Sequence, residues 1–205
     1  MTRVVLLSGL ILAVVGTVCS AAPLDLTSAL PDIFSAGIDI TYNAGADTFS
    51  AVGFSLQYNV PPDTTITDGV FDLSATIDEF GVASAGSLAI TGTTSGGTGG
   101  SGLLLEGSLI DFGFSPDGFA GAPTFEFVYE LTAGALAPDF GGVGSSVGVV
   151  LSSFDEFAGE FDINYEGTVG VADAYPVPER AAASLTALAF AGALLRARWR
   201  RVISR

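Results

Sequence analysis

The sequence predicts an all-β domain over residues 22–175, built as an antiparallel β-sandwich or a jelly-roll-like fold. Three observations lead to this fold class. Apolar and polar residues alternate with a period of two in five segments, which is typical of half-buried strands. Turn-forming Gly, Pro, Asn and Asp residues separate these segments. No helical period occurs between residues 33 and 173, so two packed sheets with acids on their outer faces are expected.

The predicted strands follow one another at short intervals along the chain. The alternating segments are, in order, Ile38–Tyr42, Phe54–Tyr58, Phe71–Ile77, Phe125–Leu131 and Phe161–Glu166. Shorter candidates are Leu88–Ile90 and Leu103–Leu105, and the apolar run Val147–Leu151 predicts a more fully buried strand. The turns are expected at Asn43–Gly45, Pro61–Asp63, Asp68–Gly69, Asp117–Gly118 and Gly141–Gly142. Only Leu26–Phe34 is predicted to hold a helical turn.

Two features leave the architecture open. A β-solenoid is the rival fold, although the chain has no fixed repeat period. The segment Gly92–Gly102 is built from Gly, Ser and Thr and cannot pack a core. It is predicted to be either a flexible hairpin tip or a gap between two half-domains.

Charge is distributed very unevenly. All seven basic residues are arginines in the two end segments, and the chain has no Lys or His. Residues 23–178 therefore contain 21 of the 22 acidic groups and no side-chain cation, a formal charge of −21. Such a surface repels nucleic acid and anionic lipid, so neither is an expected partner. The carboxylates must be solvated, hydrogen-bonded or paired with external cations.

The missing residue types exclude most enzyme mechanisms. Residues 22–178 have no His, Cys or Lys, which excludes Ser-His and Cys-His catalysis, Schiff bases and imidazole-bound zinc. A pair of carboxylates can hydrolyse a glycoside, which makes Asp78-Glu79 and Asp155-Glu156 the doublets to consider. Adjacent strand residues point to opposite faces, however, so neither doublet is itself a catalytic pair. We expect no enzyme activity and no catalytic residues.

The carboxylates are better suited to calcium binding than to catalysis, because hard cations prefer oxygen ligands. The chain has no calcium-loop motif, so no metal ligand is assigned and no cofactor is expected beyond weakly bound calcium. The acids that lie near predicted turns are the candidates: Asp63, Asp68, Asp78, Glu79, Asp117, Asp155 and Glu156.

The N-terminus has the layout of a secretory signal peptide over residues 1–21. Arg3 precedes an uncharged apolar run, and small residues follow it. Cleavage is expected between Ala21 and Ala22. An uncleaved membrane anchor and a lipidated Cys19 are the alternatives, but a bulky Val18 precedes that cysteine.

Residues 176–205 form a three-part tail. A short motif of Val177, Pro178, Glu179 and Arg180 precedes an apolar run at about 181–195, and five arginines follow: Arg196, Arg198, Arg200, Arg201 and Arg205. As a transmembrane helix, the apolar run would span only about 22 Å, which fits a transient membrane stop. The arginines place the C-terminus in the cytoplasm as an anchor, because basic residues stay on that side.

The tail resembles the PEP-CTERM sorting signal that exosortases process in Gram-negative bacteria. The resemblance is limited to about residues 176–205, and Arg180 stands where the family usually has a second proline. It implies export by signal peptidase, retention in the inner membrane, processing by an exosortase-type enzyme, and release or transfer to the cell surface or matrix. Family members are often associated with exopolysaccharide and biofilm.

These features together predict a structural protein of the cell surface or extracellular matrix, with polysaccharide as a partner bridged by calcium. The alternative is a secreted carbohydrate-binding or carbohydrate-active β-sandwich module. A third interpretation is a surface protein whose tail is never cleaved and remains in the membrane.

Overall fold

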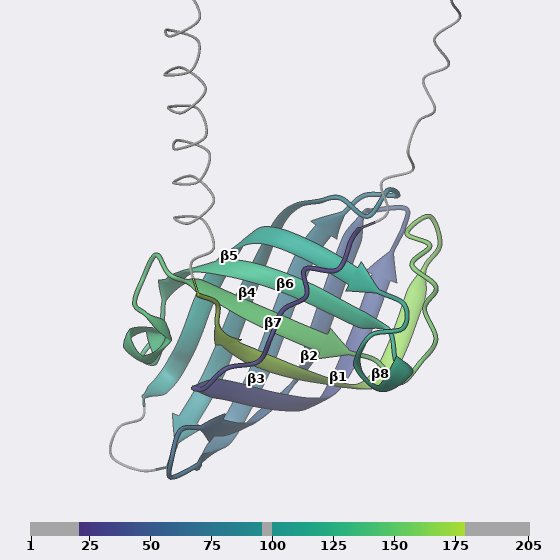
Figure 1. Ribbon diagram of the computed structural model, residues 1–205. Helices are drawn as coiled ribbons and strands as arrows, with labels where there is room; N and C mark the ends of the chain where they lie inside the picture. Colours follow the sequence, from purple (N-terminus) through teal and green to yellow (C-terminus); the bar gives the residue numbers. More distant parts are fainter. Residues whose placement is uncertain (1–20, 96–99, 179–205) are drawn as a thin grey trace, which may run out of the picture.

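The computed structural model describes residues 21–95 and 100–178, and this part of the chain forms a closed, eight-stranded antiparallel β-barrel (Figure 1). Each strand pairs with the next, and the last pairs with the first. The strands are β1 (Asp32–Asn43), β2 (Thr48–Asn59), β3 (Thr64–Ile77), β4 (Ala83–Thr94), β5 (Ser101–Ser115), β6 (Thr124–Ala133), β7 (Ser146–Ser152) and β8 (Tyr165–Pro176). The all-β, antiparallel prediction is confirmed.

The prediction of a sandwich or jelly roll is wrong, because the sheet closes on itself. β8 pairs with β1 from Ile33 opposite Ala174 to Tyr42 opposite Tyr165. The period-two pattern is the same in an open and a closed sheet, so it could not distinguish them. Closure leaves no strand edge unpaired, and bulges such as the one between Ala36 and Asp39 bend the strands around the barrel. The solenoid is excluded for the same described residues.

Three local predictions are also corrected. Residues 26–34 contain no helical turn, since the chain is irregular up to the start of β1. Phe161 precedes β8 and lies in a connection, where it is buried. The Gly-rich segment connects the paired strands β4 and β5, so it belongs to a hairpin and does not separate half-domains. The Val147–Leu151 strand is confirmed as part of β7, with Val147, Val149 and Leu151 fully buried.

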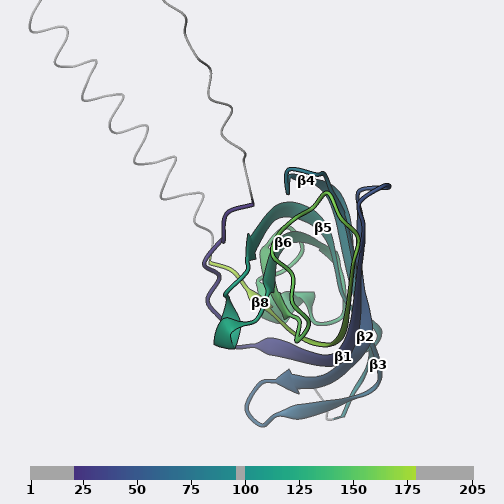
Figure 2. The same ribbon diagram turned by 90° about the vertical axis from the view of Figure 1, so that its right-hand side faces the viewer.

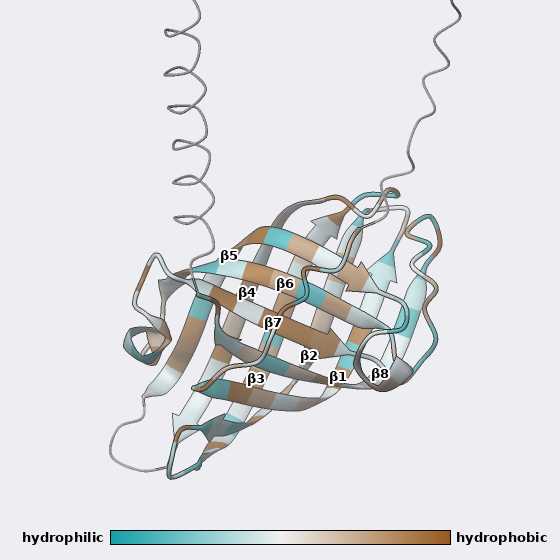
Figure 3. Ribbon diagram, viewed as in Figure 1, coloured by the Kyte–Doolittle hydropathy of each residue, from teal (hydrophilic) through white to brown (hydrophobic). Residues whose placement is uncertain are grey.

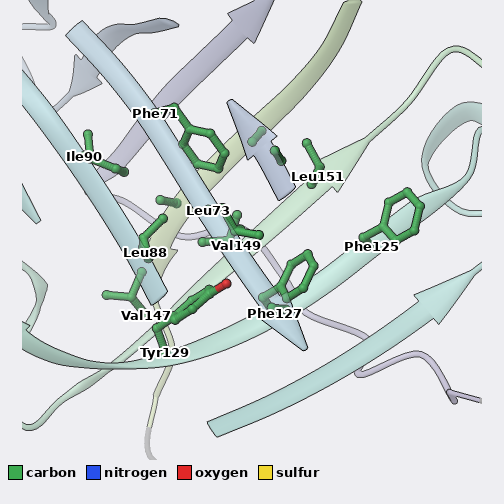
Figure 4. Close-up of a cluster of buried hydrophobic side chains, with 14 of the residues drawn as sticks. Phe71, Leu73, Leu88, Ile90, Phe125, Phe127, Tyr129, Val147, Val149 and Leu151 are labelled. Carbon is green, nitrogen blue, oxygen red and sulfur yellow. The ribbon is translucent and has the colours of Figure 1, made fainter. Parts of the chain in front are cut away.

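The core fills the inside of the barrel with apolar side chains (Figure 4). Alternate residues of each strand point inward, and apolar and polar positions are interleaved along the ribbons (Figure 3). Phe49 of β2 lies 5.0 Å from Phe125 and 5.3 Å from Phe127 of β6, between ring centroids. Each fully buried large side chain contributes about 1.5–3 kcal/mol to stability.

Both ends of the barrel are closed by connecting segments. The β7–β8 connection places Phe157 and Phe161 over one end, where their rings lie 5.2 Å apart. The short helix η2 (Ala137–Phe140) covers the other end, and Phe140 stacks on Tyr58. Tyr58 also donates a hydrogen bond of 2.8 Å to Asp139 of η2. The described strands pair in a closed ring from residue 32 to residue 176 and enclose one core, so the barrel needs no further strand to complete its sheet.

The N-terminal strap, residues 21–31, crosses the outside of the barrel (Figures 1 and 2). Its backbone passes over Gly113 of β5, where an added Cβ would lie 2.6 Å from the Ala22 carbonyl oxygen. Glu126 of β6 then accepts hydrogen bonds from the backbone N–H groups of Leu24 (2.5 Å), Asp25 (3.2 Å) and Leu26 (2.8 Å). One carboxylate thus fixes three consecutive residues of the strap.

Candidate functional site

One end of the barrel gathers carboxylates from several connections. The β1–β2, β3–β4, β5–β6 and β7–β8 connections all lie there, because consecutive strands are antiparallel. We call it the acidic end, and its acids are Asp47, Asp78, Glu79, Asp117, Asp155, Glu156, Glu160 and Asp162. Residues 21–95 and 100–178 contribute no side-chain cation to this end. The structure therefore concentrates negative charge that the sequence spreads over more than a hundred residues.

A hollow of about 410 Å³ lies between three of these connections. Four carboxylates line it, together with the aromatic ring of Phe80 and two residues of the β1–β2 turn: Asp47, Asp78, Glu79, Asp162, Phe80, Ala44 and Gly45. Asp78 and Glu79 were singled out from the sequence, whereas Asp47 and Asp162 were not. A turn position just after Asn43–Gly45 could have pointed to Asp47. Asp162 was missed because residues 161–166 were expected to form a strand.

Neutral hydrogen bonds from Tyr42 connect two of the loops at the acidic end. The Tyr42 hydroxyl donates to the backbone oxygens of Ile77 (2.9 Å) and Phe161 (2.8 Å), which joins the β3–β4 and β7–β8 connections. Burial raises the pKa of Tyr42, and the nearby carboxylates of Asp47, Asp78, Asp162 and Glu79 raise it further. Tyr42 therefore stays protonated and keeps both bonds at any physiological pH.

The aspartates of both predicted doublets hold loops in place. Asp78 accepts hydrogen bonds from the N–H groups of Phe80 (3.0 Å) and Val82 (2.8 Å) within its own turn. Asp155 accepts a 2.6 Å bond from the N–H of Thr168, which joins the β7–β8 connection to β8. Their neighbours Glu79 and Glu156 are exposed. These aspartates therefore have a structural role.

The remaining calcium candidates do not join them. Asp117 is exposed on the β5–β6 connection, while Asp63 and Asp68 lie towards the opposite end, in the β2–β3 turn and in β3. Within residues 21–95 and 100–178, no three acidic side chains are arranged so that they could hold a metal ion. The negative electrostatic potential of the hollow can therefore attract cations, although the described residues do not form a coordination sphere for one.

Two further carboxylates lie on the outside of the barrel: Asp32 of β1 is buried, and Asp173 of β8 is partly buried. Burial raises the pKa of Asp173 of β8, and the neighbouring charge of Asp32 raises it further. Burial also raises the pKa of Asp32, and this effect is larger than the lowering of the pKa by the hydrogen bond that Asn59 donates to Asp32. Asp173 lines a cavity of about 220 Å³ next to the strap, together with Leu26 and Tyr175. The two charges therefore destabilise the barrel at neutral pH.

Acidification should stabilise the barrel through these groups. When the pKa of a group is higher in the folded state than in the unfolded state, protonation of that group stabilises the fold. This stabilisation is fully present below the unfolded-state pKa and is lost as the pH rises through the folded-state pKa. We expect the melting temperature to increase as the pH falls from neutrality through the raised pKa values of these two groups. Asp173→Asn should raise the melting temperature at neutral pH and flatten this dependence. Glu166→Gln, at an exposed position of the same strand, is the control, and equal effects of the two variants would contradict the assignment.

The predicted sorting motif begins where the barrel ends. The N–H of Val177 donates a 3.0 Å bond to the Ser146 carbonyl, directly after β8, and Pro178 is exposed. Glu179, Arg180, the apolar run and the arginines lie outside the described residues, as does the signal peptide up to residue 20. Ala21 packs against the core and Ala22 is exposed. Within the described part of the chain, no helix is long and apolar enough to cross a membrane.

Comparisons of the sequence with protein-family models and with curated proteins, and of the fold with solved structures, give no significant match. The functional interpretation therefore rests on this chain's own residues.

Proposed function

We propose that this chain is an exported, non-enzymatic protein of the cell surface or extracellular matrix, delivered by a signal peptide and a PEP-CTERM-like tail. The observation that carries the proposal is the position of the described strands between the two predicted end segments. The first described strand starts at Asp32, after the predicted signal cleavage site, and β8 ends at Pro176, directly before the predicted sorting motif. Both end segments can therefore be removed without taking any strand from the barrel.

A structural role agrees with the chemistry of the barrel. Residues 23–178 offer carboxylates, hydroxyls and amides but no imidazole, thiolate, amine or guanidinium group. The aspartates of the two acidic doublets already hold loops. A closed sheet with a filled core and a polyanionic surface remains soluble and resists self-association by charge repulsion. We propose polysaccharide as its partner, bridged through calcium at the acidic end.

Processing is the direct test. The mature chain should start at Ala22 and end between Val177 and Arg180, as measured by intact mass of extracellular material from the native host. A variant in which Pro178 and Glu179 are both replaced by alanine should keep its C-terminal tail and remain in the membrane fraction. Extracellular protein that still contains Trp199 would refute the sorting proposal.

Calcium bridging has its own test. Folding brings 21 carboxylates together, a repulsion that salt screens over about 8–10 Å at moderate ionic strength. The melting temperature of residues 22–178 should therefore rise with sodium chloride, and more with calcium chloride at equal ionic strength. Asp47→Asn with Asp162→Asn should reduce the extra calcium effect, whereas Asp63→Asn with Asp68→Asn should not. A sodium effect with no additional calcium effect would exclude the bridging.

A carbohydrate-binding module is the second candidate. The specific observation in its favour is that the hollow at the acidic end combines carboxylates with the ring of Phe80, which is half exposed. Aromatic platforms beside hydrogen-bond acceptors suit sugar rings. Glycan binding by residues 22–178 that Phe80→Ala abolishes, without calcium, would favour this candidate over the calcium-bridged one.

A further inference from the structure

The outer face of β2 carries a stripe of exposed apolar side chains. Val52, Phe54 and Leu56 occupy successive outward positions and are 45%, 62% and 43% exposed. Val70 of the neighbouring strand β3 is 43% exposed and also faces outward. We call these four residues the β2 stripe. A partner that covered them would remove apolar surface from water at each position.

The alternation Phe54, Leu56, Tyr58 predicts that all three residues share the buried face. Only Tyr58 does so, because the β2–β3 register shifts between Gly53 and Gln57. Ser55, the residue after Phe54, is buried instead, and its hydroxyl lies 3.1 Å from the buried hydroxyl of Ser35, within hydrogen-bond distance. The exposed residues therefore add nothing to the core.

The Phe54 side chain packs against the backbone of the neighbouring strand β1. Phe54 pairs with Ala36 of β1, and its ring lies beside Gly37, where an added Cβ would be 3.4 Å from the ring. Gly37 has a φ of 63°, a conformation that other residues rarely adopt. The ring therefore packs on bare backbone while most of its surface remains exposed.

Carboxylates flank the β2 stripe on both sides. Val52 pairs with Asp39 of β1 in one direction and with Asp72 of β3 in the other. Both aspartates are exposed, and no side-chain cation exists in residues 23–178 to neutralise them. A partner that covers the stripe must desolvate these charges, which is favourable only if it brings positive charge to them.

The chain's own strap does not cover this surface. The strap contacts β5 and β6, whereas the stripe lies on β2 and β3 on another side of the barrel (Figure 2). A second copy of the barrel would place like charges against Asp39 and Asp72. A polysaccharide would find no hydrogen-bonding groups on Val52, Leu56 or Val70.

We propose that the β2 stripe is a docking site for a cationic amphipathic segment of a partner protein, with apolar residues on Phe54 and its neighbours and Lys or Arg beside Asp39 and Asp72. This site is separate from the acidic end and does not depend on the sorting tail. It gives the barrel a specific protein contact in addition to diffuse binding of cations.

The test measures binding of a Leu-Lys amphipathic peptide to residues 22–178, with a Leu-Glu peptide for comparison. Phe54→Ser should weaken the Leu-Lys affinity by about tenfold, as expected for a central aromatic contact. Asp39→Asn with Asp72→Asn should weaken it severalfold and reduce its salt dependence. Ile110→Ser, at an exposed position of β5, and Glu106→Gln with Glu130→Gln are the matched controls and should bind like the unchanged barrel.

Three results would overturn the proposal. Equal weakening by the stripe variants and the controls would mean that binding follows overall charge. Concentration-dependent oligomers that Phe54→Ser dissolves would identify a second copy as the occupant. Polysaccharide binding that Phe54→Ser abolishes would identify a sugar-binding face. Val70→Thr provides a second stripe variant, and melting curves of every variant establish that the barrel is folded.

Discussion

Replacing Glu126 with alanine should lower the free energy of unfolding by about 2–4 kcal/mol, because a hydrogen bond to a charged acceptor contributes about 1.5–3 kcal/mol and several are lost together. Glu126 is 6% exposed and is the acceptor for three consecutive N–H groups of the strap. Without it, the backbone of Leu24, Asp25 and Leu26 has no acceptor against the sheet. We expect the strap to detach while the barrel stays closed.

The effect is measured by chemical denaturation and by limited proteolysis of residues 22–178. The variant should be cleaved within the strap under native conditions, and its melting temperature should fall by about 5–12 °C. Glu130→Ala is the matched control, since Glu130 lies on the same strand and is exposed. A variant whose strap remains resistant to protease would show that Leu24 and Leu26 hold the strap by packing alone.

Phe125→Ala should be the most destabilising single substitution in the core, with a loss of about 3–5 kcal/mol. Phe125 is fully buried on β6 and contacts four aromatic rings at centroid distances of 5.0–6.2 Å: Phe49, Phe114, Phe157 and Tyr165. These rings come from three strands and from the connection that closes the acidic end. The cavity would therefore loosen the end of the barrel as well as its wall.

Phe54→Ala gives a comparison with the same change of side chain. Phe54 is 62% exposed, so its removal should change the stability by no more than about 0.5 kcal/mol. Urea denaturation of both variants tests the difference. Similar losses for the two substitutions would mean that Phe54 is part of the folding core, which would also weaken the docking proposal.

The strands were largely predictable because the alternation of apolar and polar residues that indicates a strand lies within each segment itself. Segments such as 71–77 and 125–131 alternate as predicted, and every second residue of each is part of the core in β3 and β6. The alternation gave a wrong prediction at Phe54 and Leu56, because a register shift in β2 changes which residues face the core. Phe161 was assigned to a strand because a buried aromatic in a connection has the same local signature as one in a sheet.

The candidate site was predictable only in part. Asp78 and Glu79 were recognised as turn acids, but their meeting with Asp47 and Asp162 depends on contacts between distant connections. The role of Glu126 was also hidden, because an acid on an outward strand position is ordinarily solvated. It is buried here because residues 21–31, about a hundred residues away in sequence, fold back across the sheet.

The sequence by itself determined the all-β class, the uniformly acidic charge of residues 23–178 and their lack of His, Lys and Arg, and it predicts sorting segments at both ends. These properties follow from composition and from short-range periodicity, which do not require knowledge of the fold. Only the tertiary structure decided that β8 closes on β1, that eight acids share one end, and that the β2 stripe faces outward. Each of these depends on strand register and bulges, which place residues in space through pairings that no local pattern records.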